Sequence, residues 1–217
     1  ARWADGSSAS GYFRGRRGMV PVALGALRSG GGSGLRLAGT YFALGAEHIL
    51  LGVDHLLFVL GLMLLVRGFG PLVKTITAFT VAHSVTLGAS VLGFIPIHRA
   101  PIEAAIALSI VLLAREIVVA DRGIVHLTHR KPWLVAFVFG LLHGLGFAGA
   151  LGEIGLPESA IPLALLFFNL GVEAGQLAFV VALLAVYRLT RGTLRQRAPK
   201  LEPLVGYALG ALATIWF

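Results

Sequence analysis

Six long apolar runs constrain this chain more than any other feature of its sequence. They cover residues 42–66, 71–92, 101–120, 132–152, 160–187 and 201–217. An α-helix of about 20 such residues crosses the ~30 Å hydrocarbon layer of a membrane. Hydrophobic residues make up 57% of the 217, more than a soluble domain of this length can bury. We therefore predict an all-α, polytopic membrane helix bundle with about six transmembrane helices, forming one domain over residues 41–217.

The first 40 residues have a different composition. They contain a Ser/Gly run at residues 29–34 and six arginines, namely Arg2, Arg14, Arg16, Arg17, Arg28 and Arg36. Segments rich in glycine and serine behave as flexible coils. We predict that residues 1–40 form a basic, flexible tail, and we assign no function to it.

Basic side chains beyond this tail fall in alternate loops. Together with Lys74 near the start of the second run, the loops after the first, third and fifth runs contain ten lysines and arginines, whereas the other loops contain only Arg99. Short cytoplasmic loops are enriched in these residues, so the sequence predicts an N-terminus outside the cytoplasm. The net charge of +8 comes from the basic tail and from these loops, and we expect a lipid bilayer, not a nucleic acid, as the partner. Arg115 and Glu116, near the cytoplasmic end of the third run, are predicted to form a local ion pair.

Ionisable residues fall at mid-depth in four of the runs. They are Asp54 and His55 in the first run, His83 in the second, His143 in the fourth and Glu173 in the fifth. A charged side chain at the bilayer centre costs about 3 kcal/mol, so this layer indicates a functional site. The chain has no cysteine, and a site of imidazole and carboxylate groups suits divalent Ni, Co or Zn. The alternative is that each side chain makes only an interhelical hydrogen bond.

His48 is a further candidate metal ligand, and its place depends on Gly52. On a straight helix, His48 and His55 are about 10 Å apart along the axis, too far to bind one ion. Either Gly52 breaks the helix, or the helix has two tiers, of which the outer one contains Glu47 and His48. In the second arrangement, Glu47, His48 and Glu103 would line the way in for a cation.

Polar residues on the second and fifth runs are expected to support the histidines. Asn169, Glu173 and Gln176 have the i, i+4, i+7 spacing of one helix face, and Ser84 follows His83 directly. Such groups orient imidazoles by hydrogen bonding. We predict that these four residues play this supporting part around the metal ligands.

Five segments of the sequence resemble the HupE/UreJ family of bacterial membrane proteins. They are HILLGVDHLLF (48–58), FTVAHSVTL (79–87), IEAAIALSI (102–110), GLLHGLGFAG (140–149) and FNLGVEAGQL (168–177). The resemblance implies a multi-pass protein of the bacterial inner membrane, of the nickel-uptake type associated with hydrogenase and urease. The family's His-x5-Asp-His motif matches His48, Asp54 and His55, and its His-Gly pair matches His143 and Gly144. The sequence departs from the nickel transporters after this pair, where it has no second histidine.

Three functions are compatible with these features. The one we favour is a transporter of a divalent transition metal, with nickel or cobalt ahead of zinc, which would not be an enzyme. The second is a membrane-embedded, zinc-dependent hydrolase acting on a lipid or a transmembrane peptide. The third is a metal-binding sensor or an accessory subunit. The sequence has no nucleotide-binding motif, so we expect no nucleotide cofactor, and it leaves a homo-oligomer open.

Overall fold

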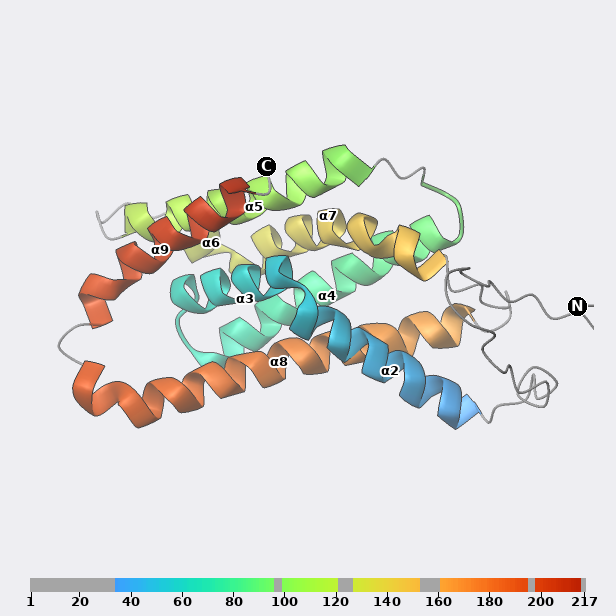
Figure 1. Ribbon diagram of the computed structural model, residues 1–217, viewed down its shortest axis with the longest axis horizontal. Helices are drawn as coiled ribbons and strands as arrows, with labels where there is room; N and C mark the ends of the chain where they lie inside the picture. The colour runs from blue at the N-terminus through green and yellow to red at the C-terminus, as the bar shows by residue number, and fades with distance from the viewer. Residues whose placement is uncertain (1–33, 96–98, 121–126, 153–160, 195–197, 216–217) are drawn as a thin grey trace, which may run out of the picture.

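The chain is helical throughout the residues that the structure describes, apart from short connections (Figure 1). The computed structural model describes residues 34–95, 99–120, 127–152, 161–194 and 198–215. The helices are α2 (Gly34–Leu51), α3 (Val53–Leu65), α4 (Phe69–Val91), α5 (Arg99–Ala120), α6 (Leu127–Arg130), α7 (Pro132–Gly152), α8 (Ile161–Leu194) and α9 (Ala198–Ile215). The described residues of each predicted apolar run are helical, apart from the break at Gly52 and the end residues Val66 and Leu92 of the first two runs, so the all-α prediction is confirmed. Residues 1–33 of the predicted tail lie outside the described residues.

Two of the described helices are long and apolar enough to cross a membrane unaided. They are α4 and the segment Ile161–Thr190 of α8. The pair α2 and α3 meets the same criterion as one broken span, because the chain bends by 73° between them. The apolar parts of α7 and α9 are shorter. The structure thus supports a membrane helix bundle, and the number of six spans stays a prediction.

The helices pack mainly in three pairs, α2 with α8, α4 with α7, and α5 with α9. Glycine makes the first two contacts close. A Cβ atom on Gly45 would overlap the carbonyl oxygen of Phe168, and one on Gly171 would overlap that of Phe42. Within a membrane, small residues let helix backbones approach until van der Waals contacts hold them together. The glycines of the α2–α8 contact therefore set the spacing of two helices that carry predicted site residues.

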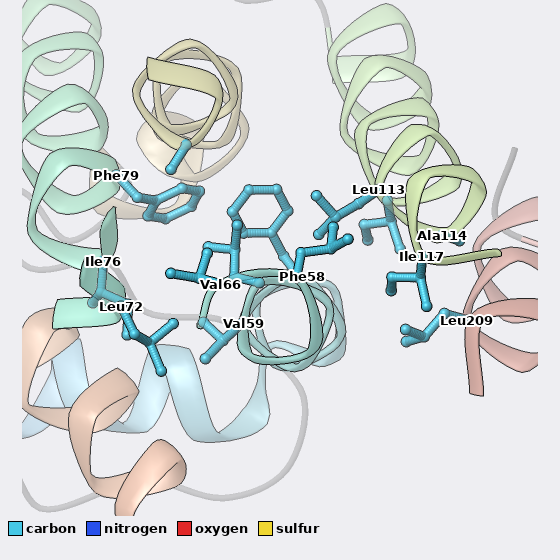
Figure 2. Close-up of a cluster of buried hydrophobic side chains, with 14 of the residues drawn as sticks. Phe58, Val59, Val66, Leu72, Ile76, Phe79, Leu113, Ala114, Ile117 and Leu209 are labelled. Carbon is cyan, nitrogen blue, oxygen red and sulfur yellow. The ribbon is translucent and has the colours of Figure 1, made fainter. Parts of the chain in front are cut away.

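Helix α3 lies at the centre of the largest apolar cluster (Figure 2). Its buried Phe58 and Val59, and Val66 directly after its end, lie between side chains of α4, among them Phe79, and side chains of α5, among them Leu113. Close packing of this kind resists displacement of a helix, because interiors are as dense as organic crystals. The cluster therefore fixes α3, and with it the polar residues of its first turn.

Most of the described basic residues lie near one end of the bundle. Helices α3, α5 and α8 end on the same side, where α4, α7 and α9 begin, at the left of Figure 1. The ammonium of Lys74 at the start of α4 lies 5.7 Å from the ring centroid of Trp133 at the start of α7. The basic residues at these helix ends include Arg67, Lys74, Arg130, Lys131 and Arg188. This end is the one predicted to face the cytoplasm.

Candidate metal centre

The bend at Gly52 forms the centre of the site. The Gly52 amide donates to the carbonyl of His48 at 2.9 Å, and the Gly52 carbonyl accepts from the Leu56 amide at 3.1 Å. The hydrogen bonds thus continue from α2 into α3, although Gly52 itself is extended with φ −78° and ψ 94°. A Cβ atom on Gly52 would lie 2.7 Å from the His48 carbonyl oxygen and 3.0 Å from Nδ1 of His55. Only glycine fits this turn without displacing the histidine.

Three histidines converge at this bend. His48, His55 and His83 each offer a ring nitrogen, and the three nitrogens lie within 4.8 Å of one another. The His48 and His55 ring centroids are 4.7 Å apart. Of the two alternatives from the sequence, the broken helix describes this structure. The other alternative, an outer tier in which His48 lies apart from His55, does not describe it, because the 73° bend brings the two rings together. Nitrogen ligands at ~2.0–2.1 Å from one ion lie less than about 4 Å apart, so an ion would draw the three atoms closer together.

Hydrogen bonds on the Nδ1 side orient two of these rings. Nδ1 of His55 lies 3.1 Å from Oδ1 of Asp54, and Nδ1 of His83 lies 3.3 Å from Oδ1 of Asn169. The Asn169 amide donates to the carbonyl of Leu165 at 2.8 Å, which turns its oxygen toward His83. Because the two oxygens accept, each Nδ1 carries the proton and each Nε2 presents a lone pair. Partners of this type fix the tautomer and orientation of metal-binding histidines.

His143 lies beside the three histidines but outside their group. Its ring centroid is 5.1 Å from that of His55, and its Nδ1 donates to the Phe139 carbonyl at 2.9 Å. Within the described part of the chain, Nε2 of His55, of His83 and of His143 is buried without a hydrogen-bond partner. Buried polar atoms are normally paired, so three unpaired nitrogens in one place are the sign of a ligand site.

Aromatic rings enclose the histidines. Phe79 stacks on His83 with an interplanar angle of 20° and a centroid distance of 6.2 Å. Phe58 lies 5.3 Å from the ring of His143, and both phenylalanines are fully buried. An apolar wall of this kind keeps water from the imidazoles and lowers the local dielectric constant. The site is therefore a set of neutral nitrogen donors in a dry surrounding.

Of the acidic residues predicted for the site, one contacts the histidine group directly. Asp54 accepts from His55, and its side chain is 29% exposed. Asp54 and Glu103 both line a cavity of about 410 Å³ between the bend and α5. Glu47 is exposed on α2. In this arrangement Asp54 orients a ligand, and it shares with Glu103 the cavity next to the site.

The predicted supporting residues divide into two kinds. Asn169 contacts a histidine directly, as described above. Glu173 accepts a hydrogen bond from Thr77, and Gln176 accepts one from Thr80 at 3.0 Å, so both connect α8 to α4. Ser84 donates to the Thr80 carbonyl of its own helix at 2.7 Å.

Two contributions to the site could not be found from the sequence. The first is the Phe139 carbonyl, which is a backbone atom and has no sequence signal beyond its i−4 position relative to His143. The second is the aromatic wall, whose phenylalanines resemble those of any apolar helix. Both depend on how the helices pack.

The fold and the histidine group define a membrane helix bundle with an enclosed cluster of imidazoles. The sequence of residues 29–217 matches the family described as HupE / UreJ protein. Since the match covers most of the chain, the protein belongs to the HupE/UreJ family, as the sequence motifs indicated. No curated protein and no solved structure shows significant similarity to the chain.

Proposed function

We propose that this protein transports a divalent transition metal ion across a membrane, with nickel or cobalt as the preferred substrate. The observation that supports this most is the convergence of His48, His55 and His83 within 4.8 Å at a helix break. Discontinuous helices that meet at a polar site are a recurrent design of membrane transporters. Ionisable residues among transmembrane helices commonly mark an ion pathway.

The donor set suits an ion that must be both bound and released. Three imidazole nitrogens favour Ni, Co or Zn over Mg or Ca, which prefer oxygen ligands. Asp54 accepts from Nδ1 of His55 and is not one of the three converging residues, so it offsets the charge of the ion without occupying a ligand position. Transport requires binding that is weak enough to permit exit. Neutral imidazole ligands, with the single carboxylate of Asp54 bound to Nδ1 of His55, meet this requirement.

The cavity lined by Asp54 and Glu103 is the proposed access route to the histidines. Two carboxylates on its wall attract a hydrated cation, and Gly52, where the chain turns toward the histidine group, also lines it. His143 is then the next ligand, since it lies beside His55 on the side of α7. The membrane is proposed to be the bacterial inner membrane, with the basic end of the bundle in the cytoplasm.

Metal uptake into proteoliposomes tests this function. Vesicles containing the full chain are mixed with NiCl2 or CoCl2, and internal metal is measured by mass spectrometry after external ions are removed. The His55→Ala variant loses a ligand, so uptake should fall by more than the ~10–100-fold typical of losing an orienting partner. The exposed His129 provides a matched control, because His129→Ala removes the same side chain far from the site.

A zinc-dependent hydrolase is the second candidate. Catalytic zinc sites also use three protein ligands with a fourth position open, and three histidines are one of their common sets. The same vesicles separate the two functions. Stoichiometric, tightly held zinc with no metal flux in wild-type vesicles would overturn the transporter. Uptake that His55→Ala abolishes and His129→Ala preserves would overturn the hydrolase.

A further inference from the structure

A second cavity lies near the basic end of the bundle, between α5, α6 and α7. Its volume is about 350 Å³, within the ~300–1,000 Å³ range of small-ligand pockets. Most of its wall is apolar, with Leu112, Val135 and Val138 among the lining residues. Three polar residues join them, namely Arg115, Glu116 and Thr128. The cavity is separate from the one that Asp54 and Glu103 line.

Two polar atoms of this wall lack partners. Within the described residues, Oε2 of Glu116 and Oγ1 of Thr128 are buried and make no hydrogen bond. Thr128 as a whole is only 1% exposed. An unpaired buried hydroxyl or carboxylate oxygen costs free energy, and native proteins satisfy nearly all such atoms. A ligand that brings hydrogen-bond donors into the cavity would satisfy both.

The third polar residue adds a positive charge. The sequence predicts an ion pair between Arg115 and Glu116, and this prediction is wrong for the described residues, where no carboxylate lies within ion-pair distance of Arg115. Adjacent residues of a helix point about 100° apart, which separates the two charged groups. One cavity therefore has a guanidinium and a carboxylate on its wall, each without an ion-pair partner among the described residues.

The geometry points to a bound phospholipid whose headgroup carries a primary ammonium, such as phosphatidylethanolamine. Arg115 would bind the phosphate, because guanidinium groups form strong charge-assisted bonds with phosphate oxygens. Glu116 and Thr128 would accept hydrogen bonds from the ammonium, and the apolar wall would contact the glycerol and upper acyl region. Arg130 and Lys131 closely follow Thr128 in the chain, and basic residues of this kind attract lipid headgroups.

Lipid retention by the purified full chain tests this inference. The protein is placed in nanodiscs of equal phosphatidylethanolamine, phosphatidylcholine and phosphatidylglycerol, and then extracted into mild detergent. Co-purifying lipids are quantified by mass spectrometry. We expect phosphatidylethanolamine to be enriched over phosphatidylcholine, because the trimethylated headgroup has no N–H to donate. Glu116→Gln and Thr128→Val should reduce the enrichment, by about tenfold for the charged partner.

Matched variants separate binding from folding. Arg115→Gln should reduce retention, whereas Arg115→Lys should restore part of it because a cation remains. Arg130→Gln removes an exposed arginine that does not line the cavity, so it should retain lipid like the wild type. Thermal unfolding in detergent identifies any variant that is merely misfolded, and the comparison then rests on those that unfold like the wild type.

Three outcomes would overturn the inference. Equal retention of phosphatidylethanolamine and phosphatidylcholine would exclude recognition of the ammonium. Preference for phosphatidylglycerol, unchanged by Glu116→Gln, would show that an anionic lipid binds instead. Retention that none of the cavity variants alters would place the bound lipid elsewhere. None of these results depends on whether the histidines transport metal.

Discussion

The α4–α7 and α5–α9 contacts both contain glycines, yet they are built differently. On α7, a Cβ atom on Gly140 would overlap the backbone oxygen of Phe79, and one on Gly144 would overlap the backbone oxygen of His83. On α9, a Cβ atom on Gly210 would lie 3.5 Å from the Cβ of Ala114, an ordinary contact. Gly210 therefore has room for a methyl group, whereas Gly140 and Gly144 lie against a helix backbone that cannot yield locally. In the α4–α7 pair, which carries His83 and His143, the two helix backbones are thus in direct contact, and this contact fixes their relative position.

Gly144→Ala should therefore have the largest effect of the changes considered below. The new methyl group would meet Thr86 and the carbonyl of His83, so α7 must move away from α4. Overpacking of this kind typically costs ~1–3 kcal/mol, and here it also displaces His143 from its place beside His55. We expect a lower unfolding temperature in detergent and weaker nickel binding, measured by thermal unfolding and isothermal titration.

Gly210→Ala is the matched change in the other helix pair. It adds the same methyl group where there is room, and alanine is the better helix former by ~0.8–1.0 kcal/mol. Its unfolding temperature should equal or exceed that of the wild type, and its nickel affinity should be unchanged. Equal destabilisation by the two substitutions would contradict the distinction between backbone and side-chain contact.

Asn169→Leu tests how much of the metal affinity depends on the orientation of His83 when all the ligands are kept. The variant retains His83 but removes the oxygen that holds its Nδ1 proton, at 3.3 Å in the structure. Loss of such a partner commonly lowers metal affinity by ~10–100-fold. Isothermal titration with nickel measures the affinity, and NMR of imidazole nitrogens labelled with 15N shows whether His83 changes tautomer.

Gln176→Leu is the control for this substitution on the same face of α8. Gln176 is as deeply buried, but it accepts from Thr80 and contacts no histidine among the described residues. Thr80 keeps its second acceptor, the Ile76 carbonyl at 3.2 Å. The tautomer of His83 should be unchanged. If both variants lost affinity equally with the tautomer intact, Asn169 would have a packing role only.

Much of the fold could be predicted because hydropathy alone specifies it. Each apolar run of about 20 residues has to form a helix in lipid, where no other structure satisfies its backbone groups. The same reasoning located the histidines, since ionisable residues are conspicuous among leucines and valines. His48, His55, His83 and His143 were all singled out by this contrast, and the structure brings the first three into one group.

The arrangement of these residues could not be predicted in the same way. Whether Gly52 bends the chain depends on backbone angles that helix periodicity does not contain, so two positions for His48 remained open. The part played by Asp54 depends on the direction of its carboxylate, which accepts from His55 at 3.1 Å. The prediction of an Arg115–Glu116 ion pair was wrong because adjacency in sequence does not place two side chains together on a helix.

Ser84→Ala should have the smallest effect, although the sequence places Ser84 next to a candidate ligand. Its hydroxyl donates to the Thr80 carbonyl one turn earlier, a bond that serves its own helix and reaches no histidine. Replacing it with alanine, the best helix former, should change stability by no more than ~0.5 kcal/mol. Nickel affinity by isothermal titration should match the wild type. A loss comparable to that of Asn169→Leu would mean that Ser84 contacts the ion or its ligands during transport, and that orientation of His83 involves α4 as well as α8.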